Sequence, residues 1–231
     1  MGRDYNKEAV LRRSRTSSKP QKFIIYVEGR NTEKSYLEKF KKTNVTPVVV
    51  RGHGIASCLA FLEESEKHFN RLPSRTRNSY TQRWLMFDYD GRADFGEAVK
   101  EARKKGFKVA FSSMCIEYWF LLHFENHSGE PIPQQGDSHS QSQINMINRH
   151  LRKYNKSAKI PVAEYESDNK TIQDDLFDLM MAINPETKNP RIVDAINRAK
   201  NMHTSKKDCG QEFNESVTSI YELLEALGVS I

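Results

Sequence analysis

The sequence predicts an α/β domain with a mainly parallel β-sheet flanked by helices, followed by a C-terminal helical layer. Between residues 20 and 125, apolar runs typical of strands alternate with segments of helical periodicity. These runs are continuous rather than alternating, which is typical of strands buried on both faces. Beyond the polar segment 126–142, the chain shows only helical patterns.

Each predicted strand is followed by a predicted helix. The run FIIYVE opens the series, and Asn31 or Thr32 is a plausible cap for the helix behind it. Gly106 closes the third helix. The strands are predicted at 23–28, 45–51, 83–90 and 107–113, and their helices at 31–42, 54–72, 93–106 and 115–125. Four more helices are predicted at 141–154, 170–183, 189–202 and 213–227.

These elements divide the chain into four parts. Residues 1–22 form a basic, flexible N-terminal tail, and 23–125 form the α/β core. Residues 126–142 are a polar loop or insertion, rich in Gly and Pro, which offers little apolar surface to a core and is suited to a mobile lid. Residues 143–231 form the C-terminal helical region packed on the core.

The net charge of +6 comes mostly from the tail. Residues 1–22 hold seven Lys or Arg and two acidic residues, so the remaining 209 residues carry only +1. Such a tail is either a nucleic-acid contact or a solvated leader.

Composition argues against a membrane or secreted protein. No apolar run approaches the roughly 18 residues that a membrane span needs, and the start of the chain lacks the apolar region of a signal peptide. Cys58, Cys115 and Cys209 are far apart, which suits neither a disulfide framework nor a zinc site. A reducing cytoplasm is therefore the expected location.

Two predicted strands end in carboxylates. Glu28 follows one apolar run, and Asp88 and Asp90 follow another. Ligands of parallel sheets bind beyond the carboxyl ends of the strands, so three acidic side chains meet there if the two strands are neighbours. Mg²⁺, or Mn²⁺ in its place, takes oxygen ligands, offsets the repulsion and supports phosphodiester hydrolysis. For Asp90, a plain turn with Gly91 is an equally good explanation.

Glu117 is a further candidate for the catalytic site. It is the only charge before His123 in a strongly apolar segment, and a lone buried acid is costly unless it is paired or bound to metal. His123 itself is better explained as a packed histidine, and zinc binding by His123, His127 and His139 has no regular spacing to support it.

Several basic residues are candidates for contacting nucleic acid. Arg30 and Lys34 flank a predicted helix start, where they would neutralise a phosphate. Arg92 follows the acidic pair, and Lys153 and Lys156 belong to the basic and aromatic stretch HLRKYNKSAK. A solvated helix end explains that last stretch equally well.

The quoted motifs resemble a known family. YVEGRNTEKSYLEKF followed by MFDYDGR resembles the two motifs of Toprim domains, and SSMCIEYWFLLHFE is similar to the hallmark of RloB-like proteins. The resemblance covers about residues 22–227. It implies a Toprim catalytic core in which Glu28 is a metal ligand or acid/base group and Asp88 and Asp90 bind metal. It also implies a bacterial antiphage role beside an ABC-type ATPase. Gly91 stands where many relatives carry another acid.

The leading functional prediction is therefore a metal-dependent nuclease, with RNA, including tRNA, favoured over DNA by analogy. One alternative is a non-catalytic subunit that binds nucleic acid or the ATPase. A second is a haloacid-dehalogenase-type phosphatase, whose DxDG opening MFDYDG resembles. That motif belongs after the first strand of such a domain, whereas here it follows the third predicted strand, and Arg92 replaces the expected Thr or Val.

Overall fold

The structure is a computed structural model of the 231-residue chain. The described residues are 20–29, 31–40, 45–51, 57–88, 91–113, 115–133, 140–166, 171–213 and 216–229. The tail 1–19 and the predicted site residues Arg30 and Asp90 lie outside them.

Four strands form one sheet, and the prediction of an α/β fold with a mainly parallel sheet is confirmed. The order is β2-β1-β3-β4, and all three neighbouring pairs are parallel. β1 and β3 are therefore adjacent central strands, as the convergence of their terminal acids requires. The strands are β1 (Gln21–Val27), β2 (Val45–Arg51), β3 (Gln82–Asp88) and β4 (Lys108–Ser112).

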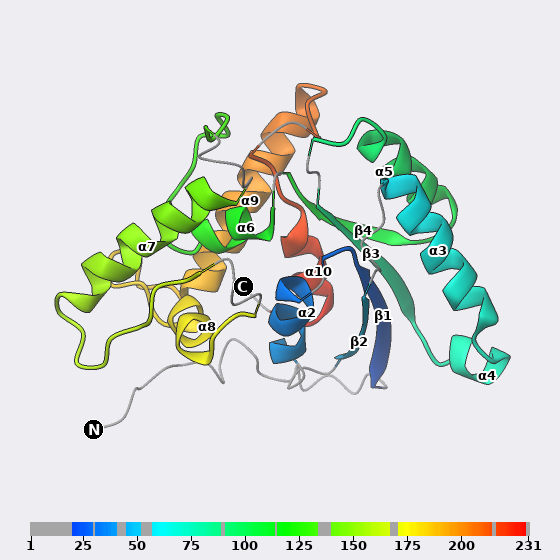
Figure 1. Cartoon of the computed structure of the whole chain (residues 1–231), viewed down its shortest axis with the longest axis horizontal. Helices are drawn as coiled ribbons and strands as arrows, with labels where there is room; N and C mark the ends of the chain where they lie inside the picture. Colours follow the sequence, from blue (N-terminus) through cyan, green and yellow to red (C-terminus); the bar gives the residue numbers. More distant parts are fainter. Residues whose placement is uncertain are drawn as a thin grey trace.

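Helices cover both faces of the sheet (Figure 1). The helices of the α/β part are α2 (Thr32–Leu37) with the 3₁₀ turn η1 (Glu38–Phe40), α3 (Cys58–Arg71), α4 (Ser74–Arg77), α5 (Phe95–Lys104) and α6 (Ile116–Leu121). The predicted C-terminal helices follow as α7 (Gln141–Asn155), α8 (Asp174–Met181), α9 (Arg191–Asp208) and α10 (Ile220–Ala226). No described helix has the length and apolar character needed to cross a membrane.

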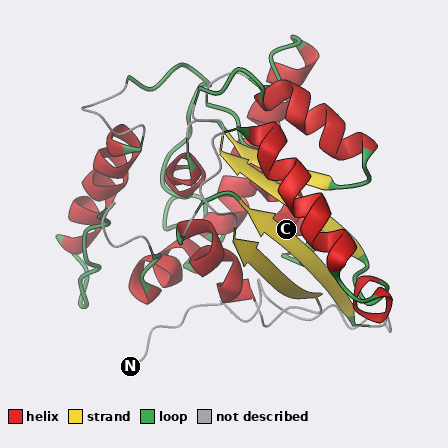
Figure 2. Cartoon of the chain, turned by 45° about the vertical axis from the view of Figure 1, so that its right-hand side comes forward, coloured by secondary structure: helices red, strands yellow, loops and turns green. Residues whose placement is uncertain are grey.

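The continuous apolar strands bury both of their faces. Ile24 and Tyr26 pack with α3 and α5 in one cluster, while Phe23, Ile25 and Val27 belong to a larger cluster with α2 and the C-terminal helices. Alternate residues of a strand point to opposite faces, so each strand contributes to both clusters. Figure 2 shows the sheet between these two helical layers.

Several elements differ from the predictions, and three of these differences concern how the chain packs. The segment 74–77 is helical, although no helix or strand is predicted between residues 72 and 83. The helix expected at 115–125 has regular α geometry only from Ile116 to Leu121, and all six residues are buried. The last helix starts only at Ile220, because the residues before it pair with β4, the outermost strand on that side of the sheet. Thr218 forms an antiparallel bridge with Ser112 there.

Part of the polar segment 126–142 is packed, contrary to the prediction that it offers little to the core. Ile132 is buried and belongs to the larger core cluster. Ser142 donates a hydrogen bond to the Pro133 carbonyl, and Ser216 donates one to the Glu130 carbonyl. Gly129 has φ +81°, and a Cβ there would collide with Met202. The described residues 126–133 are therefore anchored, and 134–139 lie outside the described residues.

Candidate active site

Glu28 and Asp88 lie at the carboxyl edge of the two central strands. The backbone N–H of Glu28 donates to the Met86 carbonyl at 3.2 Å, which extends the β1–β3 pairing by one residue. Asp88 is the last residue of β3 and pairs in register with Ser112 of β4. Asp88 is two and four residues after Met86 and Trp84, so all three side chains point to the same face of the sheet, the one covered by the layer that contains α6. Because β1 and β3 are parallel neighbours, the two strand ends that carry these acids lie side by side.

A third acidic side chain, Glu33, joins this edge from the first turn of α2. It is only 4% exposed. Its carboxylate lies against Gly29, where an added Cβ would stand 2.1 Å from either carboxylate oxygen. Gly29 is thus required by the close approach of Glu33.

Glu117 reaches the same region from the start of α6. Its carboxylate accepts a hydrogen bond from the Tyr165 hydroxyl at 3.0 Å and interacts with the Cys115 thiol. Burial raises the pKa of Glu117, and the nearby charge of Glu33 raises it further. Burial likewise raises the pKa of Cys115, with contributions from Glu117 and Asp88. Both acids therefore lie near the Cys115 thiol, which comes shortly after the carboxyl end of β4.

Tyr165 connects the C-terminal region to these acids. Its hydroxyl contacts Glu117 and the Thr32 side chain, and the charge of Glu33 acts on it as well. The side-chain amide of Asn148 in α7 holds the Tyr165 backbone from both sides: Nδ2 donates to the Tyr165 carbonyl at 2.9 Å, and Oδ1 accepts from the Tyr165 N–H at 2.8 Å. The position of the hydroxyl is therefore fixed by α7.

Arg92 forms an ion pair with Glu28. The Glu28 side chain is 7% exposed and that of Arg92 23%, so the pair lies at the rim of the acidic region. A guanidinium here neutralises one carboxylate of the cluster. Because it stays partly exposed, it also presents positive charge where a phosphate would approach.

The carboxylate oxygens suit a hard divalent cation. Among the described residues, nothing hydrogen bonds to the buried Oε2 of Glu28 or the buried Oε2 of Glu33. Burying a carboxylate oxygen that has no hydrogen-bond partner costs free energy, and a bound cation with oxygen ligands would offset that cost. Among the described residues, no three His, Cys, Asp or Glu side chains are placed so that they could hold a metal ion together. Asp90 lies outside the described residues. Carboxylate oxygens are the type of donor that Mg²⁺ and Mn²⁺ take.

The other predicted nucleic-acid residues lie in different places. The Lys34 ammonium is 3.9 Å from the Glu38 carboxylate, one helical turn further along the chain. Lys153 and Lys156 are exposed at the C-terminal end of α7, which points away from the sheet in Figures 1 and 2. Lys153 also lines a cavity of about 210 Å³ with Phe124 and His150. The structure pairs Arg92 with Glu28 and Lys34 with Glu38, and it leaves Lys153 and Lys156 at the far end of α7.

His123 is a packed histidine, as predicted. Its ring is fully buried, with Nδ1 3.1 Å from the Trp119 carbonyl oxygen. Burial lowers its pKa to about 3, so the ring is neutral. His127 packs against Tyr118, and His139 lies outside the described residues.

Glu33 and Tyr165 are the site residues that sequence reasoning missed. An acid in the first turn of a helix is ordinarily read as favourable to the helix dipole. The available signal for Glu33 was its position four residues after Gly29, in a helix that starts at the strand end. Tyr165 lies in an irregular segment 48 residues from Glu117, and no pattern in the sequence links the two.

The fold and the site together define an α/β protein with four acidic side chains gathered along the carboxyl edge of a parallel sheet. The chain belongs to the RloB-like family, because the family model described as RloB-like protein matches residues 23–227. No curated protein matches the chain. No solved structure matches it either.

Proposed function

We propose that the protein is a Toprim-type, metal-dependent nuclease that hydrolyses phosphodiester bonds of nucleic acid, with RNA, including tRNA, preferred over DNA. We further propose that it is the effector of a bacterial antiphage system and works with an ABC-type ATPase. One observation carries the nuclease proposal: carboxylates from β1, α2, β3 and α6 lie at one sheet edge, and two of their buried oxygens lack a hydrogen-bond partner among the described residues.

In this proposal Glu28 and Asp88, with Asp90, hold Mg²⁺ or Mn²⁺, and Glu33 supplies a further carboxylate oxygen. The bound ion would activate water and stabilise the leaving oxygen. Glu117 acts differently: burial raises the pKa of its carboxyl group, which favours the protonated form that a general acid needs. Tyr165 fixes the carboxyl group of Glu117, and Arg92 contacts the phosphate.

Cleavage by the purified chain tests the proposal. Labelled single-stranded RNA, tRNA, single-stranded DNA and duplex DNA are incubated with Mg²⁺, with Mn²⁺ or with EDTA, with and without the partner ATPase. We expect metal-dependent cleavage, faster on RNA, that EDTA abolishes. Absence of cleavage under every condition would refute the nuclease proposal.

That negative result would favour a non-catalytic subunit, for which the structure offers one observation. Arg92 neutralises Glu28, a proposed metal ligand, through an ion pair. An ion pair with a purely structural role would look the same, which is consistent with a site that holds no metal. Binding of RNA or of the ATPase without cleavage would support this second candidate. The phosphatase alternative predicts hydrolysis of p-nitrophenyl phosphate, but among the described strands Asp88 ends the third, β3, and not the first.

Gly29→Ala is expected to impair the site without unfolding the protein. The new methyl group would overlap the Glu33 carboxylate, so that side chain must move. We expect Mn²⁺ affinity and cleavage to fall about 10- to 100-fold, as when a supporting residue of a metal site is lost. Gly96→Ala, whose nearest neighbour atom is 3.4 Å away, is the control. Equal Mn²⁺ affinity of Gly29→Ala and wild type would show that Glu33 has no part in the site.

Tyr165→Phe is expected to slow catalysis with little loss of stability. The variant keeps the ring and the backbone contacts to Asn148 but removes the hydroxyl from Glu117. A hydrogen bond between neutral groups contributes about 0.5–1.5 kcal/mol, so kcat should fall by up to about tenfold while KM changes little. Single-turnover kinetics measure this, and an unchanged kcat would contradict it.

A further inference from the structure

The amino end of the sheet, opposite the candidate active site, carries a basic surface. We call it the basic edge. It combines residues from the starts of β1, β3 and β4, the end of α3, and α4: Lys22, Arg71, Arg75, Arg77, Arg83 and Lys108. A hydrogen bond from the Thr81 N–H to the Lys22 carbonyl at 2.8 Å ties the start of β1 to the loop that precedes β3.

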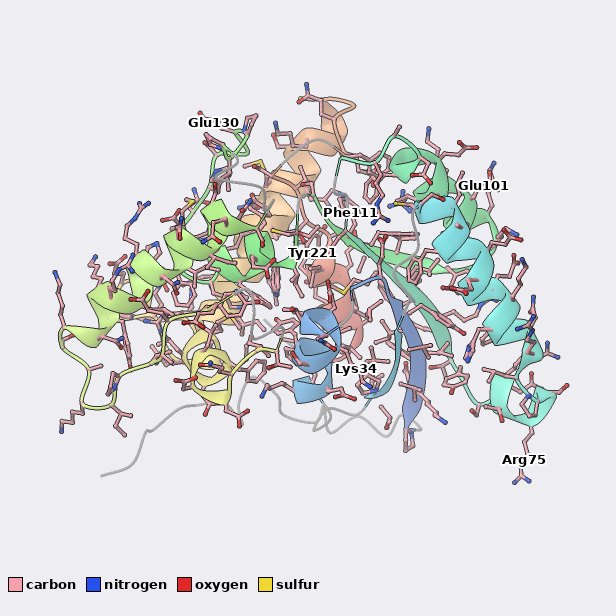
Figure 3. All side chains as sticks on the ribbon, in the orientation of Figure 1. Lys34, Arg75, Glu101, Phe111, Glu130 and Tyr221 are labelled. Atoms are coloured by element: carbon pink, nitrogen blue, oxygen red, sulfur yellow. The ribbon has the colours of Figure 1, made fainter. Side chains whose placement is uncertain are left out.

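Positive charge on this edge has little local compensation. Residues 69–83 contain four arginines and no acidic residue. Arg71 and Arg75 are exposed, and Figure 3 shows Arg75 extending outward from α4. Glu66, the acidic residue at the border, is already paired with Lys105 at 2.6 Å. Like charges held this close repel one another, and an anionic partner would offset that cost.

A pocket in the basic edge combines cations with aromatic rings. It has a volume of about 240 Å³ and is lined by Phe69, Tyr80, Thr81, Gln82, Arg83, Gly106 and Lys108, none of them acidic. The Arg83 guanidinium lies 4.7 Å from the Phe69 ring and 4.5 Å from the Phe107 ring, and it donates to the Lys105 carbonyl. The Lys22 ammonium lies 4.8 Å from the Tyr80 ring.

We propose that the basic edge binds the phosphate backbone of a nucleic acid, as a contact surface separate from the candidate active site. Clustered arginines bind phosphate oxygens, and aromatic rings between cations suit unpaired bases. The choice of nucleic acid over another polyanion rests on the proposed function. The chain also enters the described structure here, at Pro20, and the preceding 19 residues carry six Lys or Arg and two acidic residues.

The separation of the two surfaces implies a dependence on substrate length. Each central strand has seven residues, and at about 3.3 Å per residue the strands span roughly 23 Å. At about 3.4 Å per step of a strand, one molecule needs at least roughly seven nucleotides to reach both surfaces. A shorter substrate can therefore not occupy the basic edge and the candidate active site at the same time.

The test is nucleic-acid binding by a triple charge reversal. Arg71, Arg75 and Arg77 are changed to Glu, and the control changes the exposed lysines Lys100, Lys200 and Lys207 of α5 and α9 to Glu, for the same change in net charge. Fluorescence polarisation with a labelled single-stranded RNA of about 40 nucleotides should show about tenfold or more weaker binding for the test variant only. The slope of log Kd against log salt should fall by about 2, since each lost contact to a single strand contributes about 0.7.

Equal weakening by the test and control variants, or no weakening in the test variant, would overturn the proposal. Arg77 bonds to the Asn70 carbonyl and to Ser74, so its loss could disturb α4. The double change of Arg71 and Arg75, compared with Lys100 and Lys207, keeps the test valid in that case. All binding is measured in EDTA, so it does not depend on cleavage. A protein that cleaves nothing can still confirm the basic edge, and an active nuclease can still refute it.

Discussion

Glu28→Gln is expected to abolish metal-dependent cleavage while the fold remains intact. The substitution keeps the shape of the side chain and removes the charge that both Arg92 and the proposed cation use. Mutating an outer-shell partner of a metal ligand costs up to about 100-fold, so loss of a ligand itself should cost more than about 100-fold in cleavage rate. Asp88→Ala should have the same effect.

Two measurements make this prediction specific. Thermal unfolding of Glu28→Gln should stay near that of the wild type, which separates loss of activity from loss of structure. Glu64→Gln, at an exposed position of α3, is the matched control and should retain full activity. Activity that survives in Glu28→Gln would remove Glu28 from the catalytic site.

Trp119→Ala is expected to produce the largest loss of stability. The side chain is fully buried in the larger core cluster, and its Nε1–H donates to the Tyr36 hydroxyl at 2.8 Å. Truncation of a buried Phe or Trp to Ala costs about 3–5 kcal/mol, because it removes contacts and leaves a cavity. Urea denaturation should therefore show a lower midpoint and a free energy of unfolding that is about 3–5 kcal/mol smaller.

The control for that experiment is Ile160→Ala. Ile160 is 55% exposed, so its truncation should change the free energy of unfolding by less than about 0.5 kcal/mol. A similar small change for Trp119→Ala would mean that α6 is not part of a rigid core.

The sequence predicted the sheet because its strands follow a simple rule. Each is a continuous apolar run, and the structure buries both faces of β1 against different helical layers. The rule fails where packing rather than pattern decides. Ile132 sits in a stretch of Gly, Pro and polar residues, and its burial depends on contacts with distant helices. The short helix α4 likewise has no apolar periodicity to reveal it.

The candidate site could be predicted only in part, for a similar reason. Glu28 and Asp88 follow strands, so their meeting follows from the parallel topology. Glu117 stood out as a charge in an apolar segment. Tyr165 could not be predicted, because its position depends on Asn148 and on how α7 packs. The partner of Arg92, Glu28, is 64 residues away in sequence and was not foreseen either.

Cation binding tests the central claim, that the carboxylates at this sheet edge hold a divalent metal. Mn²⁺ is titrated into the wild type, Glu28→Gln, Glu33→Gln and Glu64→Gln, and bound ion is followed by electron paramagnetic resonance. We expect binding to the wild type and to Glu64→Gln, with strongly reduced binding to Glu28→Gln and Glu33→Gln. Equal binding to all four proteins, or binding to none, would contradict it.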